Sequence, residues 1–350
     1  MSKVNIVIIG AGDIAERRHI PALLKGEHTN LYGVLNRRAE STKAVAERLN
    51  IKAYGSLDEV LSDPNVQAVL IGTPPDTHAD PAIAALKHGK HVLLEKPMAL
   101  SVDEATAIDK AAKETGLKLE LLHVQRFYPQ HVKAKELLES GVIGDLLTVR
   151  TVLGNSDPEV LEGKKYPGWQ DALFNIAVHR ADLLRWLTGS RVTGVYAKVN
   201  KILSETIDGD TRETNDHVAG ILQFENGVVG TLVASKLSFH GEDRSTTLIG
   251  TKGAIITFSE GHDVVLKLSD GTTEYFDFET SHAQGVLELT DLHERFALSI
   301  LNDTPVDVTG EDGIEAVRIV EGFEKSLVRL LFQRSGGRSR PPLGDRCHQQ

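Results

Sequence analysis

The sequence predicts an α/β protein with two domains, a doubly wound parallel sheet followed by an α+β domain with a large, mostly antiparallel open sheet. Apolar strand-like runs alternate with helical patterns over roughly the first 120 residues, which is typical of a parallel sheet. From Val192 onward, short β-rich segments are separated by turn signals, which is typical of antiparallel strands. The 350 residues also exceed the length of one typical core.

Composition and charge narrow the class of protein. Apolar residues make up 41% and charged residues 25%, as in an ordinary soluble globular protein. The net charge of −10 argues against a general nucleic-acid binder, which would show a basic face. Cys347 is the single cysteine, so we expect no disulfide framework and no metal site. Because the chain shows neither a signal-peptide pattern nor a membrane-spanning run, we expect a cytoplasmic protein that does not bind membranes.

The stretch Val4–Arg18 predicts a strand, a glycine-rich turn and a helix. Its apolar, β-branched start is typical of a strand buried on both faces. Gly10, Gly12 and Ala15 follow at G-x-G-x-x-A spacing, which suits a tight bend, a close approach of pyrophosphate and close packing of helix on strand. With a helix over Ala15–Leu24, phosphates would bind the free N–H groups at its start. This predicts a dinucleotide site; the alternative is a turn that binds nothing.

The second predicted strand, Leu31–Leu35, ends in Asn36, Arg37 and Arg38. A NAD enzyme usually places an acid at this point to hold the ribose 2′-hydroxyl. No acid comes before Glu40, and guanidinium groups match a 2′-phosphate. The pattern favours NADP, with NAD as the alternative, and in a further alternative the two arginines only begin a solvated helix.

Two further strands, Val66–Ile71 and His91–Leu94, end in loops at the same edge of the sheet, where ligands of open α/β sheets bind. A lysine there can transfer a proton or polarise an oxygen; the alternative is a surface lysine. The residues of these loops are Thr73, Pro74 and His78 after the first strand and Glu95, Lys96 and Pro97 after the second. Further elements predicted for this domain are helices at Leu57–Leu61, Ala79–His88 and Val102–Thr115 and a strand at Leu117–Val124.

The second domain begins with a predicted helix at Gln130–Ser140 and a strand at Leu146–Leu153. Ser156–Trp169 lacks periodicity and predicts a loop near the cleft that touches substrate; the alternative is a plain connection. Further predictions are strands at Val195–Val199, His217–Phe224, Val228–Ser235, Ser245–Gly250, Ala254–Ser259, Val264–Leu268 and Thr273–Phe278 and helices at Leu287–Asn302 and Gly310–Ser326.

A helical pattern at Asp171–Leu187 carries a row of polar residues. Asn175, His179 and Asp182 follow Asp171 at i+4, i+8 and i+11, so we expect the four side chains to share one face. A polar face that includes a histidine favours a site; the alternative is a histidine hydrogen-bonded inside the domain.

These motifs together resemble the glucose–fructose oxidoreductase/inositol dehydrogenase/rhizopine-catabolism (Gfo/Idh/MocA) family over most of residues 3–330. The family implies a Rossmann dinucleotide domain and NAD(P)-dependent oxidation or reduction of a secondary alcohol, usually on a sugar, cyclitol or sugar nucleotide. It also implies a second domain whose open sheet covers the nicotinamide and often mediates oligomers. The resemblance rests on the glycine loop, the Thr73-Pro74 loop with His78, the run His91–Pro97 with its Glu-Lys-Pro motif, Arg126-Phe127 and the pair His179-x-x-Asp182.

The sequence departs from the family pattern in this last helix. The family normally has Asp four residues before the histidine and Gly two before it, where this sequence has Asn175 and Ala177. Asn cannot take a proton at neutral pH, although it can hydrogen-bond a sugar hydroxyl. The run Phe174–His179 resembles members that look like sugar-nucleotide 3-dehydrogenases. Asp171, one turn back, either replaces the missing acid or caps the helix.

Together, these patterns predict an NAD(P)-dependent oxidoreductase; the alternative is a dinucleotide- or sugar-sensing protein without catalysis. His179 is the preferred acid/base because its ordinary pKa lies near working pH, and Lys96 would polarise the substrate oxygen, although with Asn175 the two can exchange roles. The predicted domains are 1–124 (dinucleotide-binding) and 125–333 (substrate-binding), with a flexible tail at 334–350, and we expect a homodimer or homotetramer. Predicted substrate-binding residues are Asn175, Arg126, Asp182 and Trp169, and predicted cofactor-binding residues are Gly10, Gly12, Asp13, Ile14, Ala15, Asn36, Arg37, Arg38, Thr73, Pro74, His78, Glu95 and Lys96.

Overall fold

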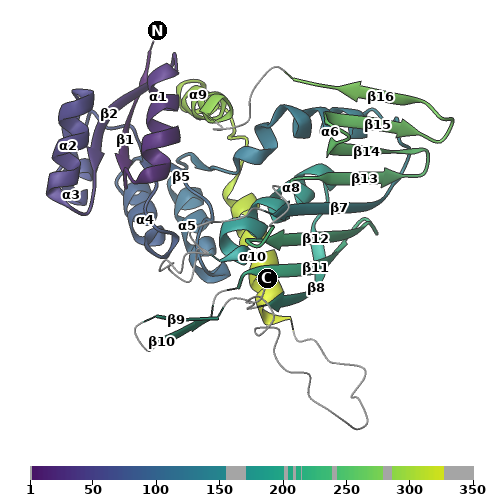
Figure 1. Cartoon of the computed structure of the whole chain (residues 1–350). Coiled ribbons are helices and arrows are strands. Elements are labelled where there is room, and N and C mark those ends of the chain that lie inside the picture. Colours follow the sequence, from purple (N-terminus) through teal and green to yellow (C-terminus); the bar gives the residue numbers. More distant parts are fainter. Residues whose placement is uncertain are drawn as a thin grey trace, which may run out of the picture.

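The computed structural model describes residues 2–154, 171–200, 204–207, 210–213, 215–238, 243–278 and 286–326. It contains two large sheets with helices between them (Figure 1). The first is a six-stranded parallel sheet in the order β3-β2-β1-β4-β5-β6, as the alternating pattern predicted. Its strands are β1 (Val4–Ile9), β2 (Thr29–Leu35), β3 (Lys52–Ala53), β4 (Ala68–Ile71), β5 (His91–Leu94) and β6 (Leu119–Leu121).

The helices of this domain follow local signals in the sequence. The longest of them starts after Ser101, whose hydroxyl accepts the N–H of Glu104, and ends at Gly116 with a φ of +67°. The central strands between the helix layers are fully buried, which explains their continuous apolar runs. The helices are α1 (Ile20–Lys25), α2 (Ala39–Leu49), α3 (Leu57–Ser62), α4 (Ala79–Lys87) and α5 (Val102–Thr115).

The strand order of the first sheet reverses between β1 and β4, because the chain runs outward from β1 through β2 to β3 and then returns to the other side of β1. Ligands of such sheets bind in the crevice at this reversal, outside the carboxyl ends of the strands. The backbones following the two strands are in close contact there. A Cβ atom at Gly10 would lie 2.7 Å from the backbone nitrogen of Thr73. The glycine loop is therefore fixed at the crevice.

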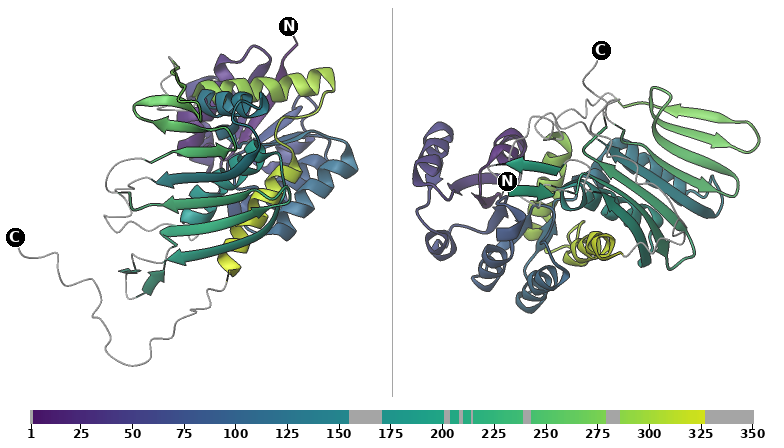
Figure 2. Two further views of the ribbon diagram at one scale, coloured as in Figure 1. Left: turned by 90° about the vertical axis from the view of Figure 1, so that its right-hand side faces the viewer. Right: turned by 60° about the horizontal axis from the view of Figure 1, so that its bottom comes forward.

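The second sheet has eight strands in the order β16-β15-β14-β13-β7-β12-β11-β8. β7 and β12 run parallel and the other pairs run antiparallel, so the predicted mostly antiparallel sheet is confirmed. One face packs on α6 (Pro129–Glu139), α8 (Val178–Thr188) and α10 (Gly310–Lys325), while the other is open in the left view of Figure 2. The strands are β7 (Leu146–Gly154), β8 (Val192–Asn200), β11 (His217–Phe224), β12 (Val229–Ser235), β13 (Thr246–Gly250), β14 (Gly253–Ser259), β15 (His262–Leu268) and β16 (Thr273–Phe276).

Helix α9 (Val286–Asn302) returns to the first domain, beside α1 (Figure 1). Its buried side chains Leu289, Leu292 and Phe296 belong to the apolar core of the six-stranded sheet. A single boundary after residue 124 therefore does not separate the two cores, because a segment near the end of the chain completes the first one. The predicted tail at 334–350 lies outside the described residues.

Two predicted α-helices begin with a π-helical turn instead. The turn η1 (Ala15–His19) precedes α1, and the turn η5 (Ala172–Ala177) precedes α8. In η1 the N–H of Ile20 bonds to the carbonyl of Ala15, five residues back rather than four. Pro21 accounts for this widening because it has no N–H to continue an α-helical pattern. π-helical turns often occur at functional sites, and both of these line the cavity described below.

Short elements without apolar periodicity were missed by the prediction. They are β3, the hairpin of β9 (Ser204–Ile207) and β10 (Asp210–Glu213), and the 3-10 turns η2 (Pro75–Thr77) and η3 (Val124–Phe127). The prediction for Leu117–Val124 was too long, since β6 ends at Leu121 and the chain then turns into η3. Within the described residues, no helix is both long and apolar enough to cross a membrane.

Candidate active site

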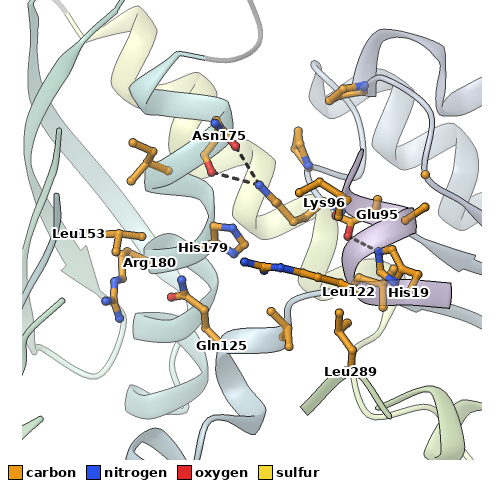
Figure 3. A pocket seen from close by; sticks show the side chains of 18 of the residues that line it. His19, Glu95, Lys96, Leu122, Gln125, Leu153, Asn175, His179, Arg180 and Leu289 are labelled. Carbon is orange, nitrogen blue, oxygen red and sulfur yellow. Dashed lines mark hydrogen bonds and ion pairs between the residues drawn. The ribbon is translucent and has the colours of Figure 1, made fainter. Parts of the chain in front are cut away.

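A cavity of about 670 Å³ lies where the two domains meet. The glycine loop, η1 and the loops after β4 and β5 form one wall, and η5 and α8 form the wall opposite (Figure 3). Segment η3 and the start of α6 add residues between these walls. The lining residues important for its chemistry are Gly12, Asp13, Ile14, Arg18, Thr73, Pro74, Glu95, Lys96, Gln125, Tyr128, His131, Asn175, His179 and Arg180.

The glycine loop has the shape of a phosphate cradle. Gly10 has a φ of +91°, a conformation that favours glycine. A Cβ atom at Gly12 would meet nothing within 4 Å, so a ligand can approach that backbone closely. The side-chain oxygen of Asn36 accepts the N–H of Ala11 at 2.6 Å, which ties the loop to the end of β2. Asn36 therefore shapes the predicted cofactor site and does not line the cavity.

Arginines after β2 and an isoleucine in the first helix face solvent. The side chains of Arg37 and Arg38 are exposed and form no ion pair with any residue that the structure describes. Ile14 lines the cavity with 45% of its surface exposed, which is unusual for so large an apolar side chain. Asp13, the residue before it, forms an ion pair with Arg17.

Lys96 and Asn175 connect the two walls directly (Figure 3). The ammonium group of Lys96 donates to the side-chain oxygen of Asn175 at 3.1 Å and to its backbone carbonyl at 3.2 Å. An ammonium group has three donors, so one is left for a ligand. Burial lowers the pKa of Lys96, which Glu95 opposes and the charges of Arg18 and Lys236 reinforce.

His179 lies one turn after Asn175 on the same wall. Its Nδ1 is buried and has no hydrogen-bond partner among the described residues. Burial lowers the pKa of His179 well below its ordinary value, and the nearby charge of Lys96 lowers it further. The imidazole is therefore neutral at pH 7 and can accept a proton.

Glu95 is held by a histidine from η1. Nε2 of His19 lies 2.8 Å from one carboxylate oxygen, and the backbone N–H of Lys96 donates to the other at 2.8 Å. The second ring nitrogen of His19 lies 3.2 Å from His293 on α9. Burial by itself raises the pKa of Glu95, but His19 and Lys96 lower it to about 2, so the carboxylate is ionised. Its oxygens are thus occupied by protein donors.

His78, a predicted cofactor-binding residue, is fully buried and does not line the cavity. Its ring nitrogens lie 3.0 Å from the carbonyl of Pro97 and 2.8 Å from that of Thr73. The histidine therefore links the two loops that bear Thr73 and Lys96. The prediction of a direct cofactor contact is corrected to a supporting role, because both polar atoms of the ring already face the backbone.

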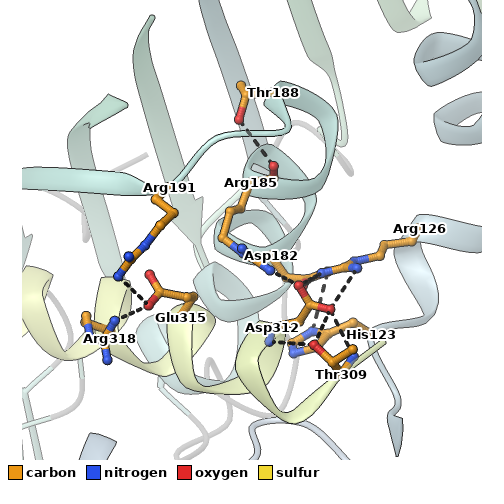
Figure 4. Close-up of polar contacts among 10 residues, drawn as sticks. All are labelled: His123, Arg126, Asp182, Arg185, Thr188, Arg191, Thr309, Asp312, Glu315 and Arg318. Atoms are coloured by element: carbon orange, nitrogen blue, oxygen red, sulfur yellow. Dashed lines mark hydrogen bonds and ion pairs between the residues drawn. The ribbon is translucent and has the colours of Figure 1, made fainter. Parts of the chain in front are cut away.

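Arg126 and Asp182, predicted to bind substrate, instead belong to a buried ion cluster formed by Arg126, Asp182, Arg185 and Asp312 (Figure 4). Nε of Arg126 donates to Asp182 at 2.8 Å, and the same guanidinium lies 3.1 Å from Asp312 on α10. Neither predicted residue lines the cavity. Their charges satisfy each other, so the structure gives them a packing role and corrects the predicted contact with substrate.

Asp171 caps the helix, which was one of the two predicted roles. One carboxylate oxygen accepts the N–H groups of Leu173 and Phe174 at 2.9 and 2.8 Å, and the other accepts the Asn215 amide at 2.8 Å. The predicted shared polar face is therefore wrong for Asp171 and Asp182, since only Asn175 and His179 line the cavity. The π-helical turn changes which positions align.

Several lining residues were not predicted from the sequence. Arg180 is 1% exposed and donates to the backbone carbonyl of Arg244 at 2.8 Å, while Tyr128 and His131 stack with ring centres 5.8 Å apart. The only sequence signal for these residues was their position next to predicted ones; Arg180, for example, directly follows His179. Trp169, the remaining predicted substrate residue, lies outside the described residues.

Comparison with known proteins covers both domains. Residues 4–123 match the family model described as "Oxidoreductase family, NAD-binding Rossmann fold", and residues 131–256 match "GFO/IDH/MocA C-terminal domain". The chain is 30% identical to a scyllo-inositol 2-dehydrogenase (NAD(+)) of Bacillus subtilis, over 79% of this chain and 80% of the relative. It is 27% identical to a myo-inositol 2-dehydrogenase of Thermotoga maritima, over 93% and 96%. An oxidoreductase domain protein from Kribbella flavida has the same fold, with a TM-score of 0.82 at 23% identity over 93% and 97%.

Proposed function

The chain belongs to the Gfo/Idh/MocA family of oxidoreductases and carries its NAD-binding Rossmann domain, and from this we propose that it transfers hydride between a nicotinamide cofactor and a secondary alcohol or ketone on a sugar or cyclitol. The observation that carries the proposal is the meeting of Lys96, Asn175 and His179 in one cavity beside the glycine loop. Relatives named as inositol dehydrogenases support a polyhydroxylated substrate.

We propose separate roles for the three central side chains. His179 is neutral at pH 7 and accepts the proton of the substrate hydroxyl. Lys96 uses its remaining N–H to hold the substrate oxygen and stabilises the negative charge that develops on it. Asn175 orients Lys96. A bound nicotinamide ring supplies the hydride acceptor or donor, and the protein supplies position and field.

The glycine loop fits the diphosphate of that cofactor, because the backbone at Gly12 is open and a helix starts just after it. For the adenosine end, we propose a preference for NADP. The exposed guanidinium groups of Arg37 and Arg38 follow β2, where a NAD enzyme usually has an acid. Arg37→Ala is expected to raise KM for NADP more than KM for NAD. Equal changes for both cofactors would contradict the preference.

We also propose a homo-oligomer formed through the open face of the eight-stranded sheet. Tyr196 on β8 pairs in register with Ile221 on β11, and both are about half exposed, as is Tyr275 on β16. Exposed apolar patches of this kind mark protein interfaces. Ile221→Lys is expected to lower the molar mass measured by light scattering, and an unchanged mass would count against this face.

A turnover screen tests the proposed reaction. The protein is mixed with NADP or NAD and a panel of sugars and cyclitols, and nicotinamide absorbance is followed. Turnover that disappears in Lys96→Ala and His179→Ala supports the proposal. The alternative is a sensing protein without catalysis, which the neutral Asn175 beside Lys96 would favour. Such a protein is expected to bind the cofactor but to show no turnover with any compound of the panel.

A further inference from the structure

Four arginine and lysine side chains of the described residues line the cavity: Arg18, Lys96, Arg180 and Arg244. The cavity cations are Arg18, Lys96 and Arg180, for which no carboxylate hydrogen-bond partner is found among the described residues. Lys96 donates to neutral oxygens only. Arg180 donates to the carbonyl of Arg244 at 2.8 Å and lies 3.4 Å from a ring nitrogen of His131. Its Nε is buried without a partner. Arg18 forms no hydrogen bond or ion pair with any described residue.

Among the described residues, the two carboxylates that line the cavity are occupied elsewhere. Glu95 accepts from His19 and from its neighbour's backbone N–H, and Asp13 pairs with Arg17, whose side chain is 68% exposed. The described lining residues therefore carry an excess of positive charge in a chain whose net charge is −10. A buried charge without a partner is costly, and a ligand of opposite charge would offset that cost.

This positive charge gathers at the reacting end of the cavity. Arg18 lies close enough to Lys96 and His179 to lower the pKa of both. Arg18, Lys96, His179 and Arg180 all line this one cavity. The phosphates of the cofactor belong at the glycine loop, where the backbone is open, so they do not account for charges beside His179. A negatively charged substrate would account for these positive charges.

We propose that the substrate carries an oxyanion, a carboxylate or a phosphate, that Arg18 and Arg180 bind while Lys96 holds the reacting oxygen. The guanidinium group matches both oxyanions in geometry and forms charge-assisted hydrogen bonds with them. This inference rests on the proposed function and narrows its substrate to anionic sugar-like alcohols, such as aldonates, uronates and sugar phosphates.

A binding titration tests the charge directly. Protein saturated with NADPH is titrated calorimetrically with D-gluconate, D-glucose 6-phosphate, inorganic phosphate and neutral D-glucose. We expect gluconate or glucose 6-phosphate to bind at least about tenfold more tightly than glucose, since a charge-assisted hydrogen bond contributes about that factor. The carboxylate and phosphate compounds show which oxyanion the site prefers.

Two variants and a matched control locate the site. Arg18→Met is expected to weaken anion binding about tenfold or more while the affinity for NADPH stays the same. Arg17→Met is the control, because Arg17 is the adjacent arginine and points outward to Asp13. Asn175→Asp, which places a carboxylate beside Lys96 with little change in shape, is expected to weaken binding of the anions but not of glucose.

Three outcomes would overturn the inference. In the first, the anionic compounds bind no better than glucose or do not bind at all. In the second, Arg18→Met weakens NADPH binding as much as anion binding, which would assign Arg18 to the cofactor. In the third, Arg17→Met has the same effect as Arg18→Met. Failure of the proposed function is a separate result, seen as intact binding of cofactor and anion with no change in nicotinamide absorbance.

Discussion

The buried ion cluster (Figure 4) and the cavity cations, of which Figure 3 labels Lys96 and Arg180, balance their charges in opposite ways. In the cluster, Arg126 meets the carboxylates of Asp182 and Asp312. In the cavity, the contacts of Arg180 with described polar groups are a carbonyl and an imidazole. Arg180 and Asp182 are two residues apart, so they project in nearly opposite directions from one helix.

This contrast separates charges that stabilise the fold from charges that are available to a ligand. The paired charges join three segments, η3, α8 and α10, and so fix the helix that bears His179. The unpaired charges face space that a ligand would fill. Variants of the ion cluster should therefore change stability, whereas variants of the cavity should change turnover or binding.

The largest expected effect is the loss of turnover when His179 is replaced. We expect His179→Ala to lower turnover by ~10²–10⁴, the usual contribution of a general base, with little change in cofactor affinity. The free energy of unfolding should fall only slightly, because Nδ1 of His179 makes no hydrogen bond. Steady-state kinetics and urea unfolding on the same preparation check both parts. Unchanged turnover would remove His179 from the mechanism.

Arg126→Met should show the opposite behaviour. Removing one partner leaves Asp182 as a buried charge, so we expect the free energy of unfolding to fall by about 3–5 kcal/mol. Protein that remains folded should keep cofactor binding, since Arg126 does not line the cavity. Urea unfolding monitored by circular dichroism measures the loss. A drop below about 1 kcal/mol would mean that the cluster contributes little.

Acid should destabilise the folded protein through three buried, neutral histidines. Burial lowers the pKa of His123, His179 and His293. Below pH 6.5 the unfolded chain binds protons that the folded protein does not, so stability should fall as pH drops from 7 to 5.5, by at most about 1.4 kcal/mol per pH unit for each histidine. Urea unfolding across this range measures the slope of the free energy of unfolding against pH, and this slope should be smaller in His179→Gln. Equal slopes would contradict the account.

The smallest expected effect on stability is that of replacing Arg180, and it contrasts directly with the effect of replacing Arg126. Arg180→Met replaces a buried cation that lacks a carboxylate with an apolar side chain, so we expect the protein without ligand to gain about 1 kcal/mol of stability or to stay unchanged. Binding of anionic compounds should weaken in the same variant. Thermal unfolding with and without cofactor measures the first part. A stability loss as large as that of Arg126→Met would show that Arg180 supports the fold.

Elements with local signals could be predicted from the amino-acid sequence alone. Apolar runs marked the central strands, and the helix predicted at Val102–Thr115 has the bounds of α5. The order of strands and loops also placed Lys96 at the sheet edge that carries the glycine loop. These features depend on side-chain burial and backbone conformation within a few residues, which the sequence displays directly.

Which polar residues face the cavity depends on tertiary packing. Arg17 and Arg18 are adjacent and chemically identical, yet within the π-helical turn η1 one faces solvent and the other lines the cavity. Asp182, three residues after His179, is drawn into the ion cluster by Arg126, which lies 56 residues earlier. Regular helical spacing predicts neither a helix that is widened by one residue nor an ion-pair partner that is distant in the chain. Both are consequences of packing.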